Sequence, residues 1–137
     1  MLLKNLIKLS LKKNNKLDIK GLSTNNKKIK KGFIFFAIKG NKLNGENYIE
    51  EAVNKGAAVV VCSKNSKFKS NKIILIKTNT IRKLLSDVAS KFYKLKPRNI
   101  IAVTGTNGKT SVADYFYQIL NINNILAASI GILGIKY

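Results

Sequence analysis

The sequence contains no histidine and no tryptophan, and only one cysteine and one proline among its 137 residues. The single cysteine, Cys62, cannot form an internal disulfide bond, and without histidine or a second cysteine a structural zinc site has almost no ligands. Lys4 and Lys8 interrupt the N-terminal apolar run, which is too short for a secretory signal or a membrane span. These absences exclude disulfide scaffolds and zinc modules. We expect a cytoplasmic protein without a membrane span.

Acidic residues are also scarce, because 6 Asp and Glu stand against 26 Lys and Arg and give a formal charge of +20. Such a surplus can indicate nucleic-acid binding, since basic side chains release counterions when they neutralise phosphates. However, 24 of the basic residues are Lys, beside 17 Asn and 18 Ile, and these three types rise together when codons are A/T-rich. Arginine, which binds phosphate and guanine more specifically than lysine does, is nearly absent. We expect no nucleic-acid partner, and a basic nucleic-acid module is the competing interpretation.

The length allows one domain of ordinary size, or a small domain plus part of another. Hydrophobic residues make up 45% of the chain, which is enough to bury a core. Three short apolar runs, at residues 33–38, 57–62 and 73–76, are continuous and rich in β-branched or aromatic side chains. Such runs are typical of strands covered on both faces. Helical segments between them indicate an α/β fold with parallel strands.

Apolar spacing predicts the helices that connect these strands. Residues 46–55 form one predicted helix, and Gly56 follows it as the C′ residue. A longer helix begins after Thr80, which is the predicted N-cap, and ends before Lys94. A short N-terminal helix is predicted to line one side with Leu2, Leu3, Leu6, Ile7 and Leu9. The inward stripe of the longer helix consists of Ile81, Leu84, Leu85, Val88, Ala89 and Phe92.

The only proline, Pro97, disfavours helix at the residue before it and indicates a domain boundary. Beyond it we expect a strand at 100–104, a helix at 109–120 and another strand at 127–130. The order strand, loop, helix, strand is typical of the start of a nucleotide-binding α/β sheet. The predicted domains are residues 1–97 and 98–137.

The loop between the strand and the helix of this second part contains two glycines and a lysine. Gly105 and Gly108 let backbone N–H groups turn towards an anion, and the helix N-terminus adds its dipole. Lys109, the predicted catalytic residue, would lie over the β- and γ-phosphates. The Thr110 hydroxyl would ligate Mg²⁺, and Ser111 would be a further backbone donor. The predicted ATP-binding residues are Gly105, Thr106, Asn107, Gly108, Lys109, Thr110 and Ser111.

The spacing of this loop departs from the usual G-x-x-x-x-G-K-[ST], because Val103 rather than glycine stands five residues before Gly108. The short form G-x-x-G-K-T is less specific by itself, since an ordinary strand-to-helix turn with a solvated lysine can carry the same letters. The predicted order of strand, loop and helix favours phosphate binding.

With these residues in view, the chain resembles the N-terminal part of the Mur ligases, the ATP-dependent amide-forming enzymes of peptidoglycan precursor synthesis. Residues 103–110, V-T-G-T-N-G-K-T, are similar to the short phosphate loop of that family. Residues 24–40 resemble its T-D-S-R-x-V-x-x-G-x-L-F-x-A-x-x-G segment. Residues 44–49 resemble D-G-x-x-[FY]-I, and residues 52–57 resemble A-x-x-x-G-A. The blocks occur in the family's order and spacing, and they span nearly the whole chain.

Two members of the family share the N-terminal block, namely the ligase that adds the third peptide residue and the ligase that adds the terminal dipeptide. Thr106, where the dipeptide-adding ligase usually has serine, and residues 131–134 favour the former. The resemblance implies that the N-terminal domain holds the uridine diphosphate of UDP-N-acetylmuramoyl-L-alanyl-D-glutamate. Residues 25–27, Asn-Asn-Lys, replace the usual Asp-Ser-Arg and remove a carboxylate, a hydroxyl and a guanidinium. The implied substrate-binding residues are Thr24, Asn26, Asn41, Lys42 and Leu43.

The resemblance also implies a reaction. ATP and Mg²⁺ convert the D-glutamate carboxylate to an acyl phosphate, and a free amino acid, meso-diaminopimelate or lysine, displaces phosphate from it. Only 27 residues follow Thr110, and the last acid is Asp114. The family's further metal ligand, modified lysine and C-terminal domain have no counterpart here. We therefore expect a fragment that does not release phosphate steadily by itself, and a non-catalytic UDP-sugar-binding domain is the alternative.

Overall fold

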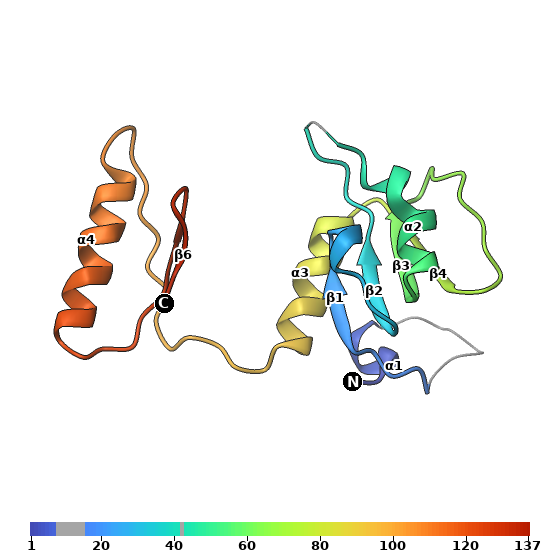
Figure 1. The fold of residues 1–137 in the computed structure, drawn as a ribbon, viewed down its shortest axis with the longest axis horizontal. Helices are drawn as coiled ribbons and strands as arrows, with labels where there is room; N and C mark the ends of the chain where they lie inside the picture. Colours follow the sequence, from blue (N-terminus) through green and yellow to red (C-terminus); the bar gives the residue numbers. More distant parts are fainter. Residues whose placement is uncertain (8–15, 42) are drawn as a thin grey trace. The chain divides into compact units, whose positions relative to one another are not determined.

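The computed structural model describes residues 1–7, 16–41 and 43–137 (Figure 1). Two sequence-based expectations, Leu9 in the N-terminal helix and Lys42 in the substrate loop, lie outside the described residues. The chain divides into two compact units, Met1–Lys96 and Pro97–Tyr137. Each unit is considered by itself below.

The first unit is built on a parallel sheet of four strands in the order β1-β2-β3-β4. The three predicted strands are confirmed, although β2 ends two residues earlier than expected and β4 begins one residue later. The first strand lies in a polar segment for which the sequence predicted no strand. Its three residues form a strand because they pair with β2, so that tertiary pairing overrides the polar character of the segment. The strands are β1 (Gly21–Ser23), β2 (Phe33–Phe36), β3 (Ala57–Ser63) and β4 (Ile74–Thr78).

The helix expected at 46–55 is present in two pieces. A 3₁₀ turn, η2 (Gly45–Tyr48), comes first and continues as α2 (Ile49–Asn54). The turn begins where Asn44 Oδ1 accepts a hydrogen bond from the Glu46 backbone N–H at 3.1 Å. Gly56 follows the helix with φ at +96°, which confirms it as the C′ residue.

The longer predicted helix is confirmed as α3 (Ile81–Phe92), and Thr80 occupies the N-cap position as expected, but without the side-chain hydrogen bond of a cap. The Thr80 hydroxyl makes no capping hydrogen bond to the helix. It lies 3.2 Å from the hydroxyl of Thr78, which also accepts from the Thr80 backbone N–H at 3.1 Å. This local turn competes with the cap for the hydroxyl group.

Helices cover both faces of the sheet in the first unit (Figure 1). On one face, α1 (Leu3–Leu6) and α3 pack over the side chains of Ile34 and Phe36. On the opposite face, α2 packs over Phe35 and its neighbours. Successive residues of β2 thus point to opposite sides, as the pleat requires. The result is a three-layer α/β unit whose buried side chains contact both faces of one sheet.

The second unit contains α4 (Lys109–Ile122) and an antiparallel hairpin of β5 (Ser129–Gly131) and β6 (Gly134–Lys136). The predicted helix is therefore confirmed, and the strand expected at 127–130 corresponds to β5. The prediction of a strand at 100–104 was wrong, since those residues have no regular secondary structure. A strand needs a hydrogen-bonded neighbour, and none of the described residues pairs with this segment.

The second unit also differs from the first in burial. All of its residues are described, and none of its side chains is buried. Large apolar side chains such as Ile122 (79% exposed) and Leu126 are open to solvent. Within the part of the chain that the structure describes, no helix combines the length and apolar character that a membrane span requires.

Candidate phosphate loop and substrate edge

The predicted phosphate loop has a backbone that depends on its two glycines. Gly105 has φ at +151° and Gly108 has φ at +75°. Gly108 is the residue before α4 and lies in the left-handed region, which side-chain-bearing residues adopt only at a cost. No side chain caps this helix N-terminus. The N–H groups of the first turn of α4 are therefore available to an anion.

Lys109 begins α4 and folds back over the loop. Its ammonium group donates hydrogen bonds to the carbonyl oxygens of Gly105 and Thr106, the latter at 3.0 Å. The whole loop from Gly105 to Ser111 is exposed. A positive charge, a helix dipole and free N–H groups thus converge on one accessible surface, which is an arrangement suited to a polyphosphate.

One residue of the loop suits a magnesium ion. The Thr110 hydroxyl stands in the first turn of α4 and is exposed. No cluster of three His, Cys, Asp or Glu side chains occurs among residues 1–7, 16–41 and 43–137. Mg²⁺ commonly keeps several waters and binds through substrate phosphates with one or two protein ligands. Thr110 therefore fits a metal that enters with the nucleotide.

Asp114, on the next turn of α4, is engaged elsewhere. Its carboxylate accepts hydrogen bonds from the Lys136 ammonium and, at 2.9 Å, from Gln118 Nε2. The hydrogen bond from Lys136 is the main cause that lowers the pKa of Asp114 below its usual value. This carboxylate joins α4 to β6 instead of facing the loop.

The other predicted site lies at the carboxyl edge of the parallel sheet. Thr24 and Asn26 follow β1, and the segment with Asn41 and Leu43 follows β2. Parallel strands end at the same edge, where α/β sheets commonly bind ligands. Gly40 N–H donates a hydrogen bond to the Leu43 carbonyl at 2.8 Å in this second segment. Topology thus brings the predicted substrate residues that the structure describes to one edge.

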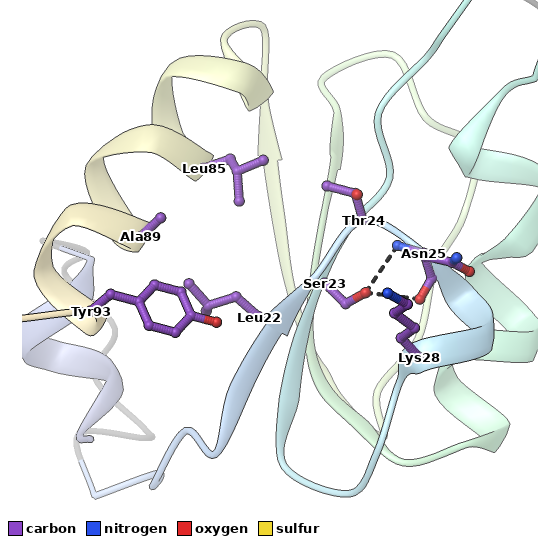
Figure 2. A pocket seen from close by; sticks show the side chains of 8 residues that line it. All are labelled: Leu22, Ser23, Thr24, Asn25, Lys28, Leu85, Ala89 and Tyr93. Atoms are coloured by element: carbon purple, nitrogen blue, oxygen red, sulfur yellow. Dashed lines mark hydrogen bonds between the residues drawn. The ribbon is translucent and has the colours of Figure 1, made fainter. Parts of the chain in front are cut away.

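A groove of about 330 Å³ runs between β1 and α3 at this edge (Figure 2). Thr24 lines it, whereas Asn26, Asn41 and Leu43 are not among its lining residues in the described chain. Figure 2 shows side chains from the α3 side facing Leu22. The sequence did not predict Leu85, Ala89 and Tyr93 as site residues, although their four-residue spacing places them on one side of the helical segment. The groove is lined by Leu22, Ser23, Thr24, Asn25, Lys28, Leu85, Ala89 and Tyr93.

A second groove of about 290 Å³ lies where β2, β3 and β4 end. Its lining includes Lys39, Asn44 and Thr78. Glu46 Oε1 accepts a hydrogen bond from the Ser63 backbone N–H at 3.0 Å and fixes the floor of this groove. None of these residues was a sequence-based site candidate, because they come together only when three strands end side by side.

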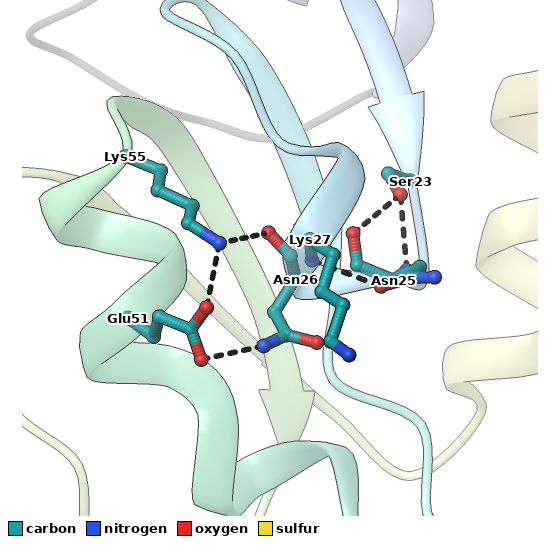
Figure 3. A network of polar contacts seen from close by, with 6 residues as sticks. All are labelled: Ser23, Asn25, Asn26, Lys27, Glu51 and Lys55. Carbon is teal, nitrogen blue, oxygen red and sulfur yellow. Dashed lines mark hydrogen bonds and ion pairs between the residues drawn. The ribbon is translucent and has the colours of Figure 1, made fainter.

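The Asn-Asn-Lys stretch forms its own local structure (Figure 3). Asn25 Oδ1 accepts from the Lys27 backbone N–H at 2.9 Å and caps the short 3₁₀ turn η1 (Asn26–Lys28). Asparagine therefore supplies the capping oxygen that an aspartate would supply in its place. Asn26 Nδ2 donates to Glu51 Oε2 of α2 at 2.6 Å, and Lys55 Nζ donates to Glu51 Oε1 at 2.6 Å. The hydrogen bonds from Lys55 and then Asn26 lower the pKa of Glu51.

Comparison with known families agrees with this fold. The sequence profile described as Mur ligase family, catalytic domain, matches residues 18–93, which is more than half of the chain. The chain belongs to the Mur ligase family, so the resemblance stated from its motifs is confirmed.

Several curated relatives share one name. UDP-N-acetylmuramoyl-L-alanyl-D-glutamate--2,6-diaminopimelate ligase of Rickettsia prowazekii (strain Madrid E) is 41% identical over 118 residues, which is 86% of this chain and 24% of that protein. The ligase of the same name from Rickettsia bellii (strain RML369-C) is 44% identical over 121 residues, which is 88% of this chain and 24% of that protein. The chain thus spans about a quarter of the length of these relatives.

Solved structures show the same fold. A ligase with the relatives' name matches 99% of this chain and 28% of its own length, with a TM-score of 0.74 and 22% identity. The structure of a MurF ligase from Thermotoga maritima in complex with ADP aligns with 74% of this chain over 23% of its own length, with a TM-score of 0.59 and 24% identity. The α/β fold class expected from the sequence is confirmed.

Proposed function

We propose that this chain supplies the UDP-sugar-binding part and the phosphate loop of an ATP-dependent ligase of peptidoglycan precursor synthesis. The substrate is UDP-N-acetylmuramoyl-L-alanyl-D-glutamate, and the amino acid joined to it is 2,6-diaminopimelate. The relatives' shared name supports both choices. In this proposal, Met1–Lys96 binds the UDP-sugar and Pro97–Tyr137 begins the nucleotide-binding domain.

The observation that carries the proposal is the left-handed Gly108 directly before an uncapped α4, with Lys109 over the loop. A solvated lysine on an ordinary turn would project into water. Here the ammonium group is held against the loop carbonyls, beside the N–H groups that a phosphate would meet. The geometry therefore favours anion binding over an ordinary strand-to-helix turn with a solvated lysine.

The residues of the loop have separate roles in the proposed reaction. Lys109 neutralises charge that develops on the γ-phosphate when the D-glutamate carboxylate attacks it, and the α4 amides orient the phosphates. Thr110 would hold Mg²⁺, which when bound neutralises the phosphate oxygens. The amine of the incoming amino acid then attacks the acyl carbon, which forms the amide bond and releases phosphate. Positioning and charge neutralisation are thus the contributions of this chain.

Calorimetric titration with a non-hydrolysable ATP analogue and Mg²⁺ tests the loop. Lys109→Ala is expected to weaken binding by about tenfold or more, because a charge-assisted contact is lost. Lys96→Ala removes the same charge from an exposed position in the other unit and serves as the control. Equal affinity of Lys109→Ala and the unmodified chain would show that the loop does not bind phosphate.

The same Lys109→Ala variant tests the other half of the proposal. It is expected to bind the UDP-sugar dipeptide as well as the unmodified chain does, because Thr24 and Asn26 lie in the first unit. Loss of that binding with the fold preserved would mean that the substrate site is misplaced. A chain that binds the UDP-sugar but no ATP analogue would favour the non-catalytic alternative.

A further inference from the structure

We propose that Glu51 is a positioning residue for the UDP-sugar site, and that it makes Asn26 a hydrogen-bond acceptor towards the ligand. The partner of Asn26 would be a hydrogen-bond donor of the uridine part, either the base N3–H or the ribose 2′-hydroxyl. This inference rests on the proposed function, because it assigns a contact within that site.

The argument begins with the chemistry of the two side chains. An ionised carboxylate only accepts hydrogen bonds, whereas an asparagine amide has one donor end and one acceptor end. Glu51 Oε2 lies 2.6 Å from Asn26 Nδ2, so the NH₂ end of the amide faces the helix. The reversed amide would place two oxygen atoms against each other. The carboxylate therefore fixes which way Asn26 points.

The acceptor end of the amide then points away from Glu51 (Figure 3). Asn26 opens η1, three residues after the last residue of β1, and so lies at the carboxyl edge of the sheet where the UDP-sugar site is proposed. A phosphate oxygen cannot donate a hydrogen bond to it, but the uracil N3–H and the ribose hydroxyls can. The polarity of Asn26 thus fits the nucleoside part of UDP and not its diphosphate.

Lys55 holds the carboxylate in place. Its ammonium group donates to Glu51 Oε1 at 2.6 Å and to the Asn26 backbone carbonyl at 3.5 Å. The three residues come from η1 and from α2 with its C-cap residue, and they join these two elements. The hydrogen bonds from Lys55 and Asn26 also lower the pKa of Glu51, which keeps the acceptor ionised at neutral pH.

Glu51→Gln is the selective test, because it keeps the size of the side chain and removes its acceptor-only character. Asn26 can then turn its amide either way. Glu50→Gln, on the same helix and exposed, makes the same charge change and is the matched control. Three probes are titrated calorimetrically into each chain at pH 7, namely UDP, N3-methyl-UDP and 2′-deoxy-UDP.

We expect Glu51→Gln to weaken UDP binding by about three- to tenfold, as for loss of one oriented hydrogen bond, and Glu50→Gln to leave it unchanged. In the unmodified chain, one of the two analogues should bind more weakly than UDP by a similar factor. That difference should shrink in Glu51→Gln. The N3-methyl analogue identifies the base as the donor, and the deoxy analogue identifies the ribose.

Each outcome has a distinct meaning. A purely structural role of Glu51 would weaken all three probes equally and leave the analogue difference intact, which overturns the positioning role. Equal binding of UDP by Glu51→Gln and the unmodified chain overturns it as well. If both analogues bind the unmodified chain as tightly as UDP, the acceptor assignment of Asn26 is wrong. If the unmodified chain binds none of the probes, the proposed UDP-sugar function fails together with this inference.

Discussion

At the scale of single residues, two of the few carboxylates each form specific hydrogen bonds, in a chain that has 26 basic residues and 6 acidic ones. Glu51 and Asp114 each contact a lysine and one amide side chain. In both cases the contact joins two elements or orients a neighbour. With so many lysines, a carboxylate finds a cationic partner readily, and its position in the fold decides what the ion pair does.

Asp114→Asn is expected to release the hairpin β5–β6 from α4, because the amide loses the charge that holds Lys136. Hydrogen exchange at residues 129–136 should become faster, whereas Asp87→Asn on α3 should leave it unchanged. Unchanged protection of the hairpin in Asp114→Asn would contradict this role of the ion pair.

The same contact gives a pH dependence whose sign follows from the lowered pKa of Asp114. A group with a depressed pKa in the folded state contributes fully above its unfolded pKa, and the contribution is lost as pH falls through the folded value. Hairpin protection, corrected for the intrinsic exchange rate, should therefore be the same at pH 7 and about pH 5 and should fall only at more acidic pH. A loss between pH 7 and 5 would argue against Asp114 as the group responsible.

At the scale of elements, glycine decides where α2 can end and β3 can begin. Gly56 has φ at +96°, and a Cβ built on it would lie 2.9 Å from Lys31 Cα. Its carbonyl also accepts from Gly32 N–H at 3.0 Å, which ties the end of the helix to the start of β2. Both the backbone angle and the close approach therefore require glycine here.

Gly56→Ala is expected to destabilise the first unit by at least about 1–2 kcal/mol, because alanine is strained in the left-handed region and meets the Lys31 backbone. Urea unfolding followed by circular dichroism measures this change. Gly131→Ala is the control, since a Cβ there would have no neighbour within 4 Å. An unchanged urea midpoint for Gly56→Ala would contradict the assigned constraint.

At the scale of the whole molecule, the two units differ in how they bury apolar surface. The hydrophobic clusters contain only residues of the first unit. In the second unit, α4 and the hairpin leave Phe116, Ile119 and Ile135 exposed by 41%, 56% and 65%. Burial of apolar surface is the main source of stability, so the free energy of opening should differ between the units.

Hydrogen exchange of the 137-residue chain should therefore show high protection in β2, β3 and α3 and much lower protection from residue 98 to residue 137. A shortened chain of residues 1–97 should unfold with the same urea midpoint as the full chain, because the core lies within it. Uniform protection across both units, or failure of the shortened chain to fold, would contradict this division.

Local sequence features determined much of this protein. Continuous β-branched runs predicted β3 and β4, and the apolar stripe predicted α3, because these patterns reflect burial on one or both faces. The two glycines of residues 105–109 adopt the positive φ angles that glycine favours, as the predicted phosphate loop requires, and phosphate binding there stays a prediction. The Mur ligase family was also recognisable from motif order alone.

Other features depended on contacts between residues far apart in the sequence, and only the tertiary structure decided them. β1 is a strand because β2 lies beside it, and residues 100–104 are irregular because no described strand pairs with them. Asn26 meets Glu51, and Asp114 meets Lys136, through folding of the chain and not through spacing. Local propensity acts within a few residues, whereas hydrogen-bond pairing and side-chain orientation depend on which surfaces the fold brings together.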